Sequence, residues 1–155
     1  MATPKMTVDR VQAAVQMYWK VFTSKSFADL PKMYTPEALV FGAYDTRPQP
    51  GRLSAARVER EYSSPKSSFR VEFLSPIEVQ ILSDTIAVAV YLLRWEAWNL
   101  EDPILGKRFN RIVPNGRVTT VFVLNPDGNL SVAHHHFSIM GSLTREEVGP
   151  PQESV

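Results

Sequence analysis

The chain of 155 residues contains no cysteine, no long apolar run and no excess of charge of either sign. Without cysteine, disulfides, thiolate metal sites and thiolate nucleophiles are all excluded. Its 17 basic and 16 acidic residues leave a formal net charge of +1, which argues against nucleic acid or an anionic membrane as a partner. The longest apolar run, Ile86 to Leu93, is far below the ~20 residues that cross a bilayer.

The two ends of the chain carry little apolar sequence. Residues 1–6 contain no apolar segment of the length that a signal peptide has, so we expect a cytoplasmic protein. We predict that residues 1–6 are flexible and that residues 7–140 form one domain. Residues 141–155, which include Gly149-Pro150-Pro151, are predicted to be a disordered tail.

The first third of the chain has the patterns of helices. Apolar residues recur at spacings of three and four over residues 8–23, which predicts a helix with Tyr18 on its apolar face. A shorter helix is predicted over residues 29–34. Residues 53–62, rich in Ala, Arg and Glu, predict a third helix with a mostly solvated face.

The rest of the chain has the patterns of strands separated by turns. Asn125-Pro126-Asp127-Gly128 is typical of a hairpin turn, and Pro114-Asn115-Gly116 is expected to interrupt a strand. Helices followed by consecutive hairpins indicate an α+β fold with the helices on one face of an antiparallel sheet. The predicted strands are residues 38–43, 69–82, 85–99, 107–112, 117–124 and 130–140.

One predicted strand is apolar on both faces. From Ile86 to Leu93, both the odd and the even positions are apolar. A strand covered on both faces is central in its sheet, with the core on one side and another surface on the other. That other surface could belong to a second subunit.

Three stretches resemble the nuclear transport factor 2-like superfamily over about residues 8–140. Residues 27–38 (FADLPKMYTPEA) are similar to the short helix and first strand of that family. Residues 116–119 (GRVT) are typical of its SnoaL-like and ketosteroid isomerase-like branches. Residues 127–130 (DGNL), followed by 133–138 (AHHHFS), are similar to the terminal hairpin of the association domain of calcium/calmodulin-dependent protein kinase II and its bacterial relatives.

The resemblance implies a cone. In this family a strongly curved antiparallel sheet surrounds an apolar cavity, three helices pack on its concave face, and the long first helix closes it. It also implies a homodimer formed through the outer face of the sheet. A small-molecule ligand is the expected occupant of the cavity, and no cofactor is expected.

All three histidines, His134, His135 and His136, lie together in the last predicted strand. Alternation places His134 and His136 on one face with Val132, and His135 on the other, without saying which face is inside. An imidazole suits proton transfer near neutrality, so His134 and His136 are candidate catalytic residues. The favoured alternative is hydrogen bonding within the sheet and a dimer contact. No further histidine or cysteine exists to complete a metal site, and none is predicted.

An acidic residue near the first strand is a second catalytic candidate. In ketosteroid isomerases the base is an aspartate at the position that matches Gly42 here, which disfavours that activity. Asp45, three residues later, is a candidate base if its loop folds inward. Otherwise it caps the turn at residues 46–48.

Five residues are candidate ligand-binding groups. The resemblance favours an inward Arg117 that holds an anionic or carbonyl-bearing ligand. Arg94, beside Glu96, either forms a polar end of the cavity or an ion pair on the outer face. Tyr18 could donate a hydrogen bond to a ligand oxygen, and Tyr44 and Trp95 could line the cavity.

Two functions follow from these residues. The first is a small-molecule-binding domain with an apolar cavity, possibly catalysing isomerisation, dehydration or cyclisation of a small carbonyl compound. The alternative is a dimerisation or assembly module in which the cavity is vestigial.

Overall fold

The computed structural model describes residues 3–43, 45–102, 104–140 and 144–147. No helix in this part of the chain is long and apolar enough to cross a membrane. Its three helices are α1 (Val8–Thr23), the 3-10 helix η1 (Phe27–Met33) and α2 (Gly51–Tyr62). Its strands are β1 (Tyr34–Phe41), β2 (Gln49–Pro50), β3 (Ser68–Phe73), β4 (Glu78–Ile81), β5 (Ile86–Glu101), β6 (Arg108–Leu124), β7 (Leu130–Ile139) and β8 (Thr144–Glu147).

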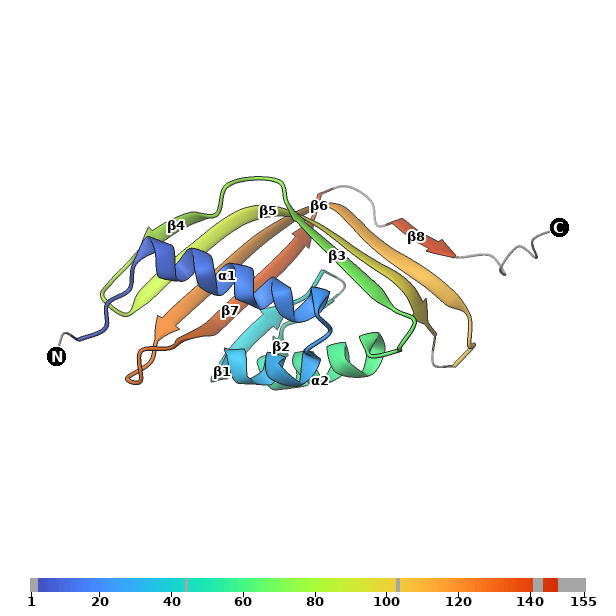
Figure 1. Ribbon diagram of the computed structural model, residues 1–155, viewed down its shortest axis with the longest axis horizontal. Coiled ribbons are helices and arrows are strands. Elements are labelled where there is room, and N and C mark those ends of the chain that lie inside the picture. Colours follow the sequence, from blue (N-terminus) through green and yellow to red (C-terminus); the bar gives the residue numbers. More distant parts are fainter. Residues whose placement is uncertain (1–2, 44, 103, 141–143, 148–155) are drawn as a thin grey trace.

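The strands form one curved sheet that arches over the helices (Figure 1). The strand order is β2-β1-β7-β6-β5-β3, with β4 also paired to β5 and β8 to β6. The predicted α+β class, with helices on the concave face, is confirmed. One pair, β1 with β7, is parallel rather than antiparallel. These two strands are far apart in the sequence, so no tight hairpin turn constrains their relative direction.

Helix α1 lies along the concave face of the sheet (Figure 1). It begins where predicted, because the Thr7 hydroxyl accepts a hydrogen bond from the Arg10 N–H (3.3 Å) and caps the helix. Its apolar stripe, which includes Val11, Val15 and Trp19, is buried. The helix therefore closes the concave side of the sheet, and its aromatic residues reach the core.

Strand β5 is internal in the sheet, as its two apolar faces predict. One face, which includes Ala89 and Leu93, is buried against the core. On the outer face Ile86, Val90 and Leu92 are 38–42% exposed. The outer side of β5 is thus an apolar surface that the described residues leave partly exposed.

The predicted strands were wrong at two places. The strand expected over residues 69–82 is two strands, β3 and β4, because the segment containing Pro76 leaves the ladder while both flanks pair with β5. Strand β6 runs through Pro114 without interruption. The register with β5 shifts between Leu93 and Trp95, and this irregularity accommodates the proline.

Both terminal segments contain residues that pair with the rest of the chain. The Met6 N–H donates to the Asp84 carbonyl (3.1 Å), and the Met6 side chain is buried. Within the predicted tail, Thr144–Glu147 form β8 beside β6. The other residues of that tail, apart from these four, lie outside the described residues.

At Gly116 an aromatic ring packs directly against the backbone of β6. A Cβ at this position would overlap the ring of Phe137 on the neighbouring strand β7. The absence of a side chain therefore allows Phe137 to pack into the concave face of the sheet.

We expect the substitution Gly116→Ala to lower the free energy of unfolding by about 1–3 kcal/mol, because the new methyl group displaces the Phe137 ring. The control Asn115→Ala, at the exposed neighbouring position, should change it by less than about 0.5 kcal/mol. Urea unfolding measures both. Equal stability of the two variants would contradict this placement of Phe137.

Candidate functional site

A cavity of about 220 Å³ lies between α1, α2 and the concave face of the sheet. It is smaller than most ligand sites, which have roughly 300–1,000 Å³, and so suits a compound of one or two rings. Its walls are mainly aromatic, with one imidazole, His135. The aromatic residues are Tyr18, Trp19, Phe22, Tyr34, Tyr62, Trp95 and Phe137.

His135 is the histidine that lines this cavity, and it is 3% exposed. Its ring stacks on that of Tyr18, with centroids 4.7 Å apart and planes inclined by 31°. Its Nδ1 lies 3.0 Å from the Thr120 hydroxyl, within hydrogen-bond distance.

The two histidines predicted to be catalytic, His134 and His136, do not line the cavity. A bulge explains this correction: the pairing of β7 with β6 shifts so that Ala133 has no partner between Val132 and His134. An extra residue in one strand exchanges its faces, so the alternation that begins at Val132 does not continue to His134. Val132 is buried together with His135 instead.

Burial makes His135 a poor base. Desolvation, and to a lesser extent the neighbouring charges of His134 and His136, lower its pKa from 6.5 to about 3. The imidazole is therefore neutral at physiological pH. A base whose conjugate acid is so acidic removes protons poorly near pH 7.

Two tyrosine hydroxyls meet at the cavity wall. The Tyr18 and Tyr34 oxygens are 2.7 Å apart and share a hydrogen bond. Burial raises the pKa of Tyr34 to about 12 and raises the pKa of Tyr18 well above its ordinary value. Both hydroxyls therefore stay protonated. Only one of their two protons takes part in the hydrogen bond between them.

Trp95 places a third polar group in the wall. Its side chain is 4% exposed, and its indole N–H has no acceptor among the described residues. An orphaned buried donor costs about 1–3 kcal/mol, which a ligand or a water with an acceptor atom offsets. The structure thus places Tyr18 and Trp95, two of the predicted ligand-binding residues, in the cavity wall.

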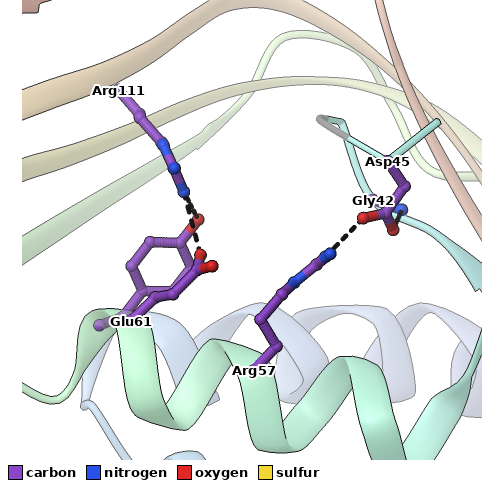
Figure 2. Close-up of polar contacts among 6 residues, drawn as sticks. Gly42, Asp45, Arg57, Glu61 and Arg111 are labelled. Carbon is purple, nitrogen blue, oxygen red and sulfur yellow. Dashed lines mark hydrogen bonds and ion pairs between the residues drawn. The ribbon is translucent and has the colours of Figure 1, made fainter. Parts of the chain in front are cut away.

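Asp45 folds inward but does not line the cavity. Its Oδ2 accepts the Gly42 N–H (2.6 Å), and its Oδ1 lies 2.6 Å from Arg57 Nη2 (Figure 2). The second contact is an ion pair without hydrogen-bond geometry. The carboxylate is fully buried behind Arg57, so it positions that guanidinium, which does line the cavity.

A second ion pair lies beside the first at the rim. Arg111 Nη1 donates to Glu61 Oε2 (3.2 Å) and to the Tyr62 hydroxyl (2.8 Å), and the Arg111 and Glu61 side chains are drawn in Figure 2. Each of the two cavity-lining guanidiniums, Arg57 and Arg111, thus faces a carboxylate. The rim charges balance, which does not favour a strongly charged ligand.

The arginines predicted to bind ligand lie elsewhere. Arg117 is exposed on the outer face, opposite Leu92. Arg94 Nη2 pairs with Glu96 Oε1 (2.8 Å), which is the alternative that the sequence left open. Neither lines the cavity. The fifth candidate, Tyr44, lies outside the described residues.

Sequence reasoning missed the contribution of α2. Ser54, Arg57, Val58 and Glu61 all line the cavity, at spacings of three and four that place them on one helix face. The helical spacing of these four residues was therefore visible in the sequence. Because this face is polar, its composition predicts a solvated surface instead. Among the described residues, no three His, Asp or Glu side chains gather as metal ligands.

Solved structures resemble this chain in fold. A protein with a cystatin-like fold from Caulobacter vibrioides matches with a TM-score of 0.62 and 17% identity, over 86% of this chain and 89% of that one. A ketosteroid isomerase-like protein from Erwinia carotovora matches with a TM-score of 0.63 and 14% identity, over 87% and 97%. The CamKII hub homology domain of Chlamydomonas reinhardtii matches with a TM-score of 0.66 and 17% identity, over 88% and 100%.

These likenesses confirm the nuclear transport factor 2-like, cystatin-like fold that the sequence predicts. At such low identity they show the fold alone, since this fold hosts unrelated activities. No protein-family model matches the sequence, and no curated protein matches it.

We expect His135 to make the protein less stable in acid. Its pKa is about 3 when folded and 6.5 in the reference state, so between these values the unfolded chain binds more protons. Stability is then complete above pH 6.5 and falls as the pH decreases, by about 1.4 kcal/mol per unit. Urea unfolding between pH 6 and 4 should show this extra slope relative to His135→Gln.

The exposed His136 provides the control. His136→Gln should keep a slope close to that of the wild type, because this substitution leaves the buried His135 in place. A His135→Gln variant with the wild-type slope would contradict the burial of a neutral imidazole.

Proposed function

We propose that this protein binds a small, planar and mostly apolar ring compound in the cavity between α1, α2 and the sheet. The observation that carries the proposal is an aromatic-rich space of about 220 Å³ whose wall includes the unpartnered, buried indole N–H of Trp95. Aromatic walls with a few placed polar groups are typical of ligand sites rather than of a packed core.

The same residues favour binding over histidine-catalysed chemistry. A proton abstraction needs a base, and His135 is too acidic in its protonated form. Among the described acidic side chains, Glu61 alone lines the cavity, and it is paired with Arg111. If a carbonyl compound reacts here by isomerisation, dehydration or cyclisation, the supported contribution is stabilisation of a developing oxyanion by Tyr18 and Tyr34.

Filling the cavity should abolish binding. Val58 lines it from α2, so Val58→Trp occupies the space, whereas Leu53→Trp places the same side chain at a 55% exposed position of the same helix. Fused-ring probes such as 1-indanone, indane and indole, present at 100 times the dissociation constant, should stabilise the wild type by about 2.7 kcal/mol. Thermal-shift titration measures this.

Leu53→Trp should respond as the wild type does, and Val58→Trp should not respond. If no probe stabilises the wild type, or if Val58→Trp responds equally, the cavity is not the binding site.

A second candidate function, assembly, is favoured by the outer face of β5. Ile86, Val90 and Leu92 form an apolar row there that the single chain leaves partly exposed. We propose that this row forms a homodimer contact, with the Arg94–Glu96 pair at its end. Burying apolar surface of this kind in a dimer contact would stabilise the dimer by roughly 25 cal/mol per Å². The two functions are compatible, because they use opposite faces of the sheet.

We expect a dimer mass in solution at micromolar concentration, measured by light scattering. Val90→Glu should give a monomer, because it places a charge in the apolar row. Leu105→Glu, at a 67% exposed position in the turn after β5, is the matched control and should remain dimeric. A monomeric wild type would refute the outer-face contact.

A further inference from the structure

The two guanidiniums at the rim of the cavity are held in different ways. Arg111 Nη1 donates to two acceptors, Glu61 Oε2 (3.2 Å) and the Tyr62 hydroxyl (2.8 Å). Arg57 Nη2 instead lies 2.6 Å from Asp45 Oδ1, in an ion pair without hydrogen-bond geometry (Figure 2). The contact with Asp45 therefore balances the charge of Arg57 without an N–H group of the guanidinium being aligned on the carboxylate.

The carboxylate of Asp45 is fixed by the backbone just after β1. Its Oδ2 accepts the Gly42 N–H (2.6 Å), while the Asp45 N–H donates to the Gly42 carbonyl (3.1 Å). The side chain of Asp45 is fully buried, whereas that of Arg57 is 33% exposed and lines the cavity. An occupant of the cavity thus meets the guanidinium and not the carboxylate behind it.

The chemistry of a guanidinium limits what Arg57 can bind. It has five N–H donors in a planar fork and no acceptor, so a ligand group that contacts it must present an acceptor atom. Asp45 already balances the charge of Arg57, and the second rim pair is neutral as well. A negatively charged ligand group would therefore add an unbalanced charge to a partly buried site. A neutral oxygen accepts an N–H without adding charge.

We infer that Arg57 is a specificity-determining donor, held by the positioning residue Asp45, and that the ligand presents to it a neutral acceptor oxygen, as in a ketone, ester or amide. This inference rests on the proposed binding of a small ring compound. The ring lies among the aromatic side chains, and its oxygen points to α2. Donor groups elsewhere on the ligand are compatible with the site, because the hydroxyl oxygens of Tyr18 and Tyr34 accept as well as donate.

Two matched probes test this role in the wild type. The ketone 1-indanone should bind roughly tenfold more tightly than indane, which lacks the oxygen, because a hydrogen bond to a charged group contributes more than one between neutral groups. Calorimetry near pH 7 measures both dissociation constants. Equal binding of the two probes would overturn the role of Arg57.

Removing both charges of the pair assigns the preference to Arg57. In the double variant Arg57→Met/Asp45→Asn, the new amide oxygen can still accept the Gly42 N–H, and no unpaired charge is left buried. The ratio of the two dissociation constants should fall close to one. Arg52→Met, the same change at an exposed position of α2, should keep the wild-type ratio. If the double variant keeps that ratio too, another group selects the ketone.

The single variant Asp45→Asn tests the positioning role of the carboxylate. It leaves the charge of Arg57 unbalanced, so the site should now accept an anion. We expect indane-1-carboxylate to bind roughly tenfold more tightly to Asp45→Asn than to the wild type, while indane binds equally to both. A loss of affinity for both probes would show that Asp45 only supports the fold. Tighter binding of the carboxylate than of 1-indanone to the wild type would refute the neutral ligand.

The outcomes separate this inference from the proposed function. If no probe binds the wild type, the proposed binding function fails, and the role of Arg57 fails with it. If indane and 1-indanone bind equally, and Val58→Trp removes the binding of both, the cavity binds ligands and only the role of Arg57 is wrong.

Discussion

The register of β7 is the constraint on which the interior depends. The strand lies between β1 and β6, and the bulge at Ala133 determines which side chains face the helices. In this register His135 stacks on Tyr18 and contacts Thr120, while His134 and His136 remain outside. A slip of one residue would bring two imidazoles into the core and remove the partner of Thr120, because side chains alternate along a strand.

Charged side chains and neutral hydrogen-bonding groups occupy different parts of the cavity. Full charges are confined to its rim, where α2 meets the sheet and each guanidinium has a carboxylate beside it, as for Arg57 and Asp45. The aromatic interior contains neutral polar groups, such as the paired Tyr18 and Tyr34 hydroxyls and the imidazole of His135 beside Thr120. In a low-dielectric interior neutral donors cost less to bury than charges, yet they still discriminate among ligand atoms.

The elements that the sequence predicted well are those defined by local periodicity. Helix α1 has the predicted bounds because its apolar stripe and the Thr7 cap both lie within a single segment. The two apolar faces of β5 likewise identified it as an internal strand. The continuity of β6 through Pro114 was missed, because strand pairing on both sides overrides a local turn signal.

The sequence by itself determined the α+β class, the helix stripe and the presence of all three histidines in one strand, since these depend on spacing along the chain. Only the tertiary structure decided that His135 is the inward histidine, because one unpaired residue at Ala133 reverses the alternation and no local pattern marks it. The same holds for the cavity arginines. Arg57 pairs with Asp45 and Arg111 with Glu61, and in each pair the two residues come from different segments that only folding brings together.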